Sequence, residues 1–184
     1  MLTTLAITGA GVSLGALSYA MFHPRSQLLG KVHYRRPEEN ASRIALTFDD
    51  GPHPDATPAI LDLLARHRMT ATFFVIGRHA QAHPDLIYQI HDQGHILGNH
   101  TFDHHHLGTA RHTRYWMNQL QQTGHVLQEI LGKRPALFRP PMGFRSPWTM
   151  VAARRLNLHV INWSRSGRDG VTTTSDNIRS RLEH

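Results

Sequence analysis

The sequence contains no cysteine, so disulfide bonds and thiolate zinc sites are excluded. It also lacks internal repeats and low-complexity tracts. Acidic side chains are few, with 13 Asp and Glu against 20 Lys and Arg, and the net charge of +7 permits attraction to anionic membranes, acidic cell-wall polymers or nucleic acid. The basic residues are scattered without interleaved aromatics and no nucleic-acid motif accompanies them. Nucleic acid is therefore not expected as a partner.

What is present fits one globular domain. The 184 residues are 40% hydrophobic and 18% charged, a composition that can bury a substantial core. Sixteen histidines are a heavy load, and most of them must be ordinary surface residues.

The N-terminus begins with an uncharged stretch, residues 2–22, just long enough for a membrane-spanning helix. We expect a hydrophobic signal-anchor or signal segment at residues 1–24, a basic connector at 25–42 and the folded domain at 43–184. Four basic residues follow the stretch: Arg25, Lys31, Arg35 and Arg36. By the positive-inside tendency they would keep the domain cytoplasmic, whereas a small-x-small pattern at Ser18 and Ala20 favours cleavage and secretion. Membrane anchoring through residues 2–22 and secretion both stay open.

From Ile44 onward, short apolar runs alternate with amphipathic stretches. Strands are predicted at 44–48, 70–76, 95–99, 136–139 and 159–163, and helices at 59–66, 84–93, 113–131, 146–156 and 174–182. Strict alternation of this kind predicts an α/β fold with a parallel sheet or barrel. The chain stops after a helix, where another strand would be due.

Two adjacent carboxylates, Asp49 and Asp50, end the first predicted strand, and Gly51-Pro52 marks a turn after them. In α/β folds, catalytic groups gather at the carboxyl ends of strands. Successive strand residues point in opposite directions, so the two carboxylates would have separate environments and separate roles, one as a metal ligand and one as a base. Taken alone, the same residues also fit an ordinary surface turn.

A histidine cluster follows the third predicted strand, at the same edge of the sheet. His100 and His104 are four residues apart, which in a helical turn puts both imidazoles on one face. With Asp50 they would form a two-His, one-carboxylate site for a divalent metal, while His105 and His106 would face solvent. The same ligand set suits an Fe(II) oxygenase, although the βα alternation counts against that fold.

Three segments together resemble a known family. Thr47–Pro52, His100–His104 and Phe138–Pro141 resemble, in order and in placement at strand ends, the first three motifs of the polysaccharide deacetylases, carbohydrate esterase family four. The resemblance covers Ile44 to Asp169. It implies a distorted (β/α)₇ barrel, here without its last strand, that removes N- or O-linked acetyl groups from a polysaccharide in the cell envelope.

The resemblance also implies roles for individual residues. Asp50, His100 and His104 would hold a divalent metal, usually zinc, and Asp49 would be the general base. A metal lowers the pKa of bound water, and a carboxylate beside it can take the proton. Arg139 would pair with Asp49 and favour its charged form.

Three departures from the family pattern bear on activity. Met142 replaces the usual Tyr after Arg-Pro-Pro, but the backbone N–H that serves the oxyanion is kept. Asp169, which resembles the catalytic Asp of the fourth motif, is followed by Gly170 where the family usually has Trp, which indicates a more open site. The fifth motif, with its general-acid His, has no counterpart. A catalytically impaired glycan-binding or scaffold protein on the same fold is therefore the alternative.

Overall fold

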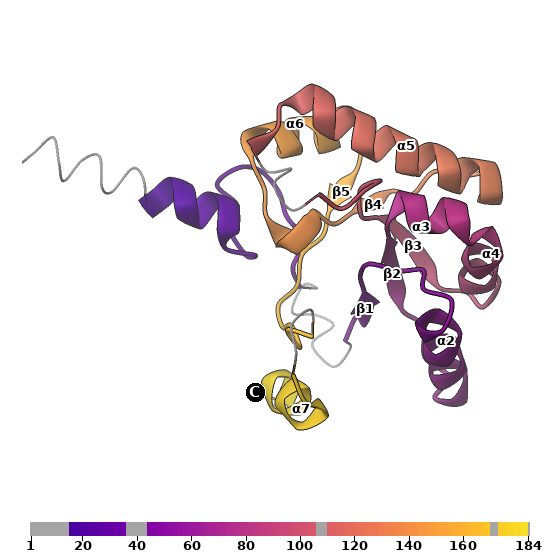
Figure 1. Cartoon of the computed structure of the whole chain (residues 1–184). Coiled ribbons are helices and arrows are strands. Elements are labelled where there is room, and N and C mark those ends of the chain that lie inside the picture. Colours follow the sequence, from indigo (N-terminus) through magenta and orange to yellow (C-terminus); the bar gives the residue numbers. More distant parts are fainter. Residues whose placement is uncertain (1–14, 36–43, 106–109, 170–172, 184) are drawn as a thin grey trace, which may run out of the picture.

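The computed structural model describes residues 15–35, 44–105, 110–169 and 173–183 (Figure 1). Most of the predicted signal or anchor segment, the end of the connector, His106 and Gly170 lie outside these residues. Residues 15–22 are helical. In the described part of the chain, no helix combines the length and apolar character needed to cross a membrane.

The centre of the fold is a parallel sheet of five strands in the order β1-β2-β3-β4-β5, the order of the chain itself. The strands are β1 (Thr47–Phe48), β2 (Thr72–Val75), β3 (Ile96–Asn99), β4 (Leu137–Phe138) and β5 (His159–Val160). All four pairings are parallel, which confirms the predicted α/β class. Closure into a seven-stranded barrel stays a prediction.

Helices separate the strands as the alternation predicts. They are α2 (Ala56–Arg66), α3 (Gly77–Ala82), α4 (Pro84–Asp92), α5 (Thr113–Leu131), α6 (Pro147–Arg155) and α7 (Ser175–Glu183), with a 3₁₀ turn at Pro141–Gly143. α5 ends at Gly132, which has a left-handed φ of 73° that glycine adopts without strain. Ser146 caps α6 by accepting a hydrogen bond from the Thr149 N–H at 3.3 Å.

α3 is absent from the sequence-based prediction, in which the strand at 70–76 is followed only by the helix at 84–93. The helix begins at Gly77, which lies against the loop after β3, and the Gly77 N–H donates to the Thr101 carbonyl at 2.8 Å. A Cβ atom here would lie 2.5 Å from Thr123 Oγ1 and 2.6 Å from Phe102 Cδ2. Glycine is thus required for close approach rather than for chain reversal.

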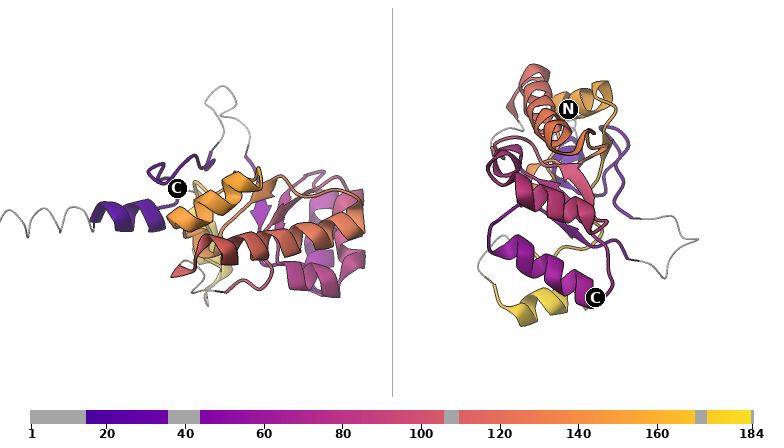
Figure 2. Two further views of the ribbon diagram at one scale, coloured as in Figure 1. Left: turned by 90° about the horizontal axis from the view of Figure 1, so that it is seen from above. Right: turned by 90° about the vertical axis from the view of Figure 1, so that its right-hand side faces the viewer.

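Two apolar clusters lie between the sheet and its helices, and α5 contributes to both. One packs α2, α3 and α4 against β2, with Leu61, Phe73 and Ile87 among its buried residues. The other packs α6 against β4 and β5, around Trp116 and Phe138. Figure 2 shows α5 and α6 side by side, with α3 and α4 next to α5. The packing leaves the carboxyl ends of β1, β3 and β4 at one edge of the sheet.

Candidate active site

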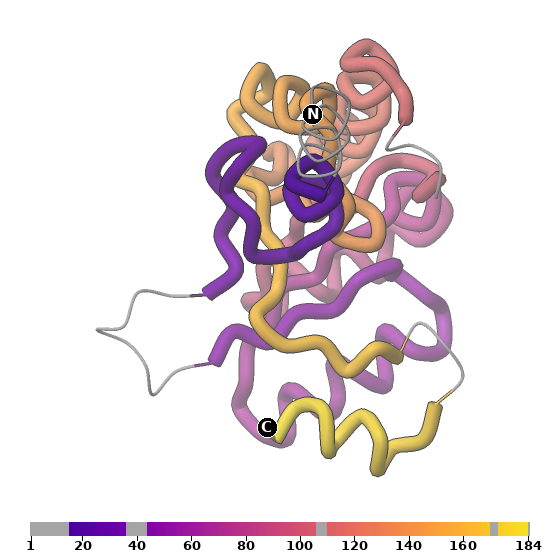
Figure 3. The backbone as a smooth tube through the Cα atoms, turned by 90° about the vertical axis from the view of Figure 1, so that its left-hand side faces the viewer, coloured from indigo at the N-terminus to yellow at the C-terminus, as the bar shows by residue number. Residues whose placement is uncertain are grey.

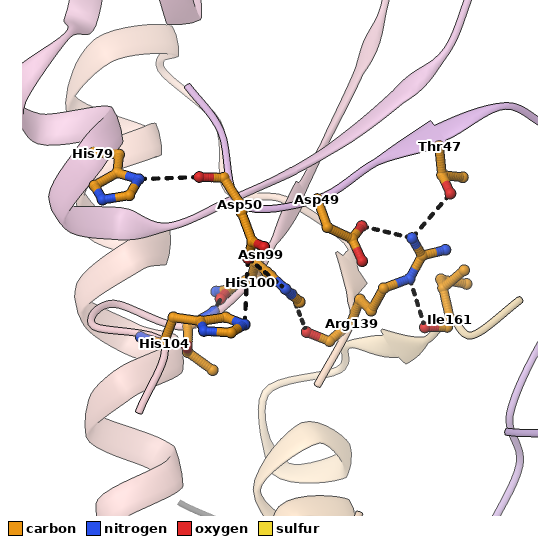
Figure 4. A network of polar contacts seen from close by, with 10 residues as sticks. Thr47, Asp49, Asp50, His79, Asn99, His100, His104, Arg139 and Ile161 are labelled. Carbon is orange, nitrogen blue, oxygen red and sulfur yellow. Dashed lines mark hydrogen bonds and ion pairs between the residues drawn. The ribbon is translucent and has the colours of Figure 1, made fainter. Parts of the chain in front are cut away.

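Asp49 and Asp50 follow β1 directly, and the backbone turns sharply between them. Asp50 has a φ of 68°, a left-handed conformation that is rare outside glycine. The carbonyl oxygen of Asp50 lies 3.0 Å from His79 Nδ1, and the Gly51 carbonyl accepts a 2.9 Å hydrogen bond from the Ile76 N–H. In Figure 4 Asp49 points toward Arg139, while Asp50 points toward the histidines of the next loop.

Asp50, His100 and His104 form a compact group. One ligand atom from each lies within 4.8 Å of the others. Asp50 Oδ1 is 3.4 Å from His100 Nε2 and 3.3 Å from His104 Nε2. The hydrogen bond with His100 lowers the pKa of Asp50, the charges of the nearby imidazoles lower it further, and burial opposes them.

The three side chains fit a divalent metal. His100 is buried, and its Nδ1 lies 2.7 Å from the Arg139 carbonyl oxygen. An Nδ1–H that donates to this carbonyl leaves the Nε2 lone pair directed at Asp50, the arrangement usual for a ligating histidine. Two imidazole nitrogens and one carboxylate suit zinc, and they also suit Fe(II).

The loop that carries the two histidines is not the helical turn that the four-residue spacing predicted. Thr101 and His104 have φ values of 68° and 52°, so the chain reverses irregularly here. Asn99 stabilises this path, because its Oδ1 accepts a 2.9 Å bond from the Thr101 N–H and its Nδ2 donates to the Leu120 carbonyl at 2.9 Å. The imidazoles meet because of this loop, with ring centroids 4.8 Å apart.

α5 holds the same loop from outside through Gln119, which is buried. Its Oε1 accepts hydrogen bonds from the N–H groups of Phe102 (3.0 Å) and Asp103 (3.1 Å), and its Nε2 donates to Asp103 Oδ2 at 3.0 Å. Tyr115 OH donates to Asp103 Oδ1 at 3.4 Å. Burial raises the pKa of Tyr115, and the charge of Asp103 and this hydrogen bond raise it further.

Arg139 follows β4 and is buried. Its Nη1 donates to Asp49 Oδ1 at 2.6 Å and to Thr47 Oγ1 at 2.9 Å, and its guanidinium carbon lies 4.1 Å from the centre of the Phe74 ring. Burial lowers the pKa of Arg139, and the charge of Asp49 opposes this shift. The ion pair thus fixes one oxygen of Asp49 beside the three clustered side chains.

Met142 lies in the turn that follows Arg139, with a left-handed φ of 56°. The N–H groups of Gly143 and Phe144 close this turn onto the carbonyls of Pro140 (2.9 Å) and Pro141 (3.0 Å). The Met142 N–H takes part in neither of these two bonds, and the Met142 side chain is exposed.

Asp169 is exposed, and in the described part of the chain none of the polar contacts of Asp49, Asp50 or Arg139 involves it. Its predicted catalytic role stays a prediction.

The comparison with known proteins agrees with these motifs. The family model of the polysaccharide deacetylases matches residues 36–161. The chain belongs to this family.

Several polysaccharide deacetylases resemble the chain over most of its length. It is 35% identical to a peptidoglycan-N-acetylglucosamine deacetylase of Bacillus cereus over 143 residues, which are 78% of this chain and 52% of the relative. It is 36% identical to a chitooligosaccharide deacetylase of Azorhizobium caulinodans over 150 residues, 80% of this chain and 70% of the relative. The chain thus spans between half and about two thirds of the length of these relatives.

Solved structures show the same fold. The Bc1960 peptidoglycan N-acetylglucosamine deacetylase, in complex with a naphthalenyl hydroxamate, superposes with a TM-score of 0.75 at 33% identity, covering 82% of this chain and 69% of that one. A mutant of BA3943, described as a carbohydrate esterase family 4 pseudoenzyme with restored activity, has a TM-score of 0.76 at 26% identity, covering 83% and 56%.

Sequence reasoning missed Asn99 and Gln119 as parts of this candidate site. A signal for Gln119 was present, because it lies one turn of α5 before Thr123 on a face that also buries Trp116 and Leu120. A long amide in such a position needs a buried hydrogen-bond partner. The sequence could not name that partner, which belongs to the loop after β3.

Proposed function

We propose that this protein is a metal-dependent hydrolase that removes acetyl groups from a polysaccharide. The observation that carries the proposal is the meeting of Asp50, His100 and His104 within 4.8 Å. The Asp49–Arg139 ion pair beside them supplies a separate carboxylate. Membership of the polysaccharide deacetylase family supports the same reaction.

Asp50, His100 and His104 would hold the metal, and we propose zinc. A divalent metal in this position polarises an acetyl carbonyl and lowers the pKa of a water molecule. His100 would be oriented by its contact with the Arg139 carbonyl. Arg139 would then support both parts of the site, because its guanidinium holds the proposed base Asp49 and its carbonyl orients the proposed metal ligand His100.

Asp49 would be the general base. Arg139 engages Oδ1, so Oδ2 is available to accept a proton from the attacking water. The Met142 N–H would donate to the oxyanion that develops on the acetyl group. The exposed Met142 side chain would then border the substrate.

The names of the relatives point to amide-linked acetyl groups on amino sugars, since they are described as N-acetylglucosamine, N-acetylmuramic acid and chitooligosaccharide deacetylases. We propose an N-acetylated glycan of the cell envelope as the substrate. The net charge of +7 favours an acidic cell-wall polymer. The protein would reach the envelope as a secreted or membrane-anchored chain through residues 2–22.

The test is acetate release by the full-length protein from N-acetylglucosamine oligomers and from N-acetylated peptidoglycan. We expect release that a chelator abolishes and that added Zn²⁺ restores. Asp50→Asn is the matched inactive control. Iron-dependent activity that requires an oxidisable co-substrate would overturn the proposal.

The alternative of a glycan-binding protein that has lost catalysis has support in the similarity to a described pseudoenzyme. In that case the chain would bind the oligomers, with or without metal, and release no acetate. Measuring binding and release on the same preparation separates the two functions.

A further inference from the structure

Residues 21–26 precede the family match, which begins at residue 36, yet they pack beside the turn formed by residues 140–144. We call this turn the Met142 turn. Figure 3 shows the indigo helix of residues 15–22 next to the orange segment that contains it. Two buried polar residues, Arg145 and Asn162, make most of the hydrogen bonds that hold the N-terminal segment beside the Met142 turn.

The first is Arg145, which is 1% exposed. Its N–H donates to the Met21 carbonyl at 3.0 Å, and its Nη1 donates to the Ser26 carbonyl at 2.9 Å. Its Nη2 donates to the His23 carbonyl. Among the described residues no carboxylate pairs with this guanidinium, and burial lowers the pKa of Arg145. A buried charge is costly unless hydrogen bonds compensate it, so Arg145 depends on these carbonyls and they depend on it.

The second is Asn162, which is 4% exposed and follows β5. Its Nδ2 donates to the Pro24 carbonyl at 3.1 Å and to the Gly143 carbonyl at 3.4 Å. One amide group therefore joins the N-terminal segment to the Met142 turn. Phe22 adds an edge-to-face contact with Phe144, with ring centroids 4.8 Å apart.

The Met142 turn needs such support because its backbone is strained. Met142 has a left-handed φ of 56°, which is unfavourable for a residue with a Cβ atom, whereas the φ of 67° at Gly143 is one that glycine adopts without strain. A Cβ atom on Gly143 would lie 2.8 Å from Trp163 Cη2 and 3.3 Å from Asn162 Oδ1, so the turn is also closely packed against these two side chains. A non-glycine residue keeps such a conformation only where the surrounding structure over-determines it.

We propose that residues 21–26 hold the Met142 turn in its left-handed conformation, with Arg145 and Asn162 as the positioning residues. We call residues 21–26 together with Arg145 and Asn162 the clamp. Its consequence for catalysis rests on the proposed function, because the clamp directs the Met142 N–H toward the acetyl oxygen. The segment before the family match is then a working part of the active site rather than only a connector.

The test compares Asn162→Ala and Arg145→Gln with Arg155→Gln, a control on an exposed arginine of α6. Hydrogen–deuterium exchange is followed in peptides that cover residues 139–147, 21–26 and, as an internal reference, β2. In Asn162→Ala and Arg145→Gln, which we call the clamp variants, amide exchange should be faster across residues 139–147 and 21–26. Exchange in β2 should be the same as in the wild type. The kcat of the clamp variants should fall by about 10²-fold, the effect of a misplacement near 1 Å, with KM and bound metal little changed.

Unchanged exchange across residues 139–147 in both clamp variants would overturn the proposal. Faster exchange that includes β2 would do the same, since it would show a general loss of stability. If Arg145→Gln does not fold, Asn162→Ala and Phe22→Ala carry the test. A wild-type chain that is inactive while its Met142 turn still responds to the clamp variants would overturn the proposed function and leave the clamp standing.

Discussion

Arg139 Nη1 lies 2.6 Å from Asp49 Oδ1, although 90 residues separate the two in the chain. Each residue directly follows a strand, and β2 and β3 lie between those strands in the sheet. Three strand spacings of about 4.8 Å would place the strand ends roughly 14 Å apart in a flat sheet. The long Arg139 side chain and the Asp49 side chain together bridge this gap, so the ion pair connects the first and third motifs across the two intervening strands.

We predict that this pair is coupled energetically. Arg139→Met should lower the free energy of unfolding by about 3 kcal/mol, because it leaves Asp49 partly buried without its partner. A double-mutant cycle with Asp49→Asn should give a coupling of about 1.5–3 kcal/mol, the range of hydrogen bonds to charged groups. Urea denaturation measures all four variants. Arg134→Met, on an exposed arginine, should change stability by less than about 0.5 kcal/mol. Additive effects of the two site variants would show that the contact contributes nothing.

Removing the charge of Asp49 and removing that of Asp50 should have different effects on metal binding and on activity. Asp49→Asn should keep bound metal and lose about 10²–10⁴-fold in kcat, as expected for removal of a general base. Asp50→Asn should lose both metal and activity. Metal analysis on purified variants, together with acetate release, measures the difference. The reverse pattern would exchange the two roles.

The convergence of the strand ends was predictable from the sequence. Asp49, Asp50, His100 and Arg139 each follow an apolar run, and parallel strands bring such positions to one edge. The bounds of α5 were also predictable, since Thr113 opens an amphipathic run that Gly132 ends.

Local backbone geometry was not predictable. A four-residue spacing suggested a helical turn between His100 and His104, but positive φ values at Thr101 and His104 create the loop instead. Those values depend on hydrogen bonds that loop N–H groups donate to the side-chain oxygens of Asn99 and of Gln119, which is distant in the sequence. Strand alternation predicted that Asp49 and Asp50 point in different directions. It could not predict the direction of Asp50, which depends on the positive φ of this residue.

Metal binding should depend on two histidines and not on their neighbour. His100→Ala and His104→Ala should each reduce zinc affinity by more than about 100-fold, since removal of a ligand exceeds the 10–100-fold effect of losing an outer partner. His105→Ala should bind as the wild type does. Competition with a chromogenic chelator gives the three affinities. Equal losses in all three variants would contradict the assignment.

The last prediction concerns Gln119, which holds the loop between the proposed metal ligands through hydrogen bonds with Phe102 and Asp103. Gln119→Leu keeps the size of the side chain and leaves the Phe102 and Asp103 N–H groups without their acceptor. It should lower zinc affinity by about 10–100-fold, whereas Gln121→Leu, on the exposed face of α5, should not.

A charge exchange can separate loop positioning from general destabilisation. Gln119→Glu keeps the acceptor for both N–H groups but replaces the donor to Asp103 Oδ2 with a second carboxylate, so repulsion should weaken zinc binding. Adding Asp103→Asn restores a donor opposite the introduced carboxylate and removes the repulsion. We therefore expect the double variant to bind zinc more tightly than Gln119→Glu alone. If the second change instead weakens binding further, Asp103 acts on the metal site independently of Gln119, and the proposed support from α5 is wrong.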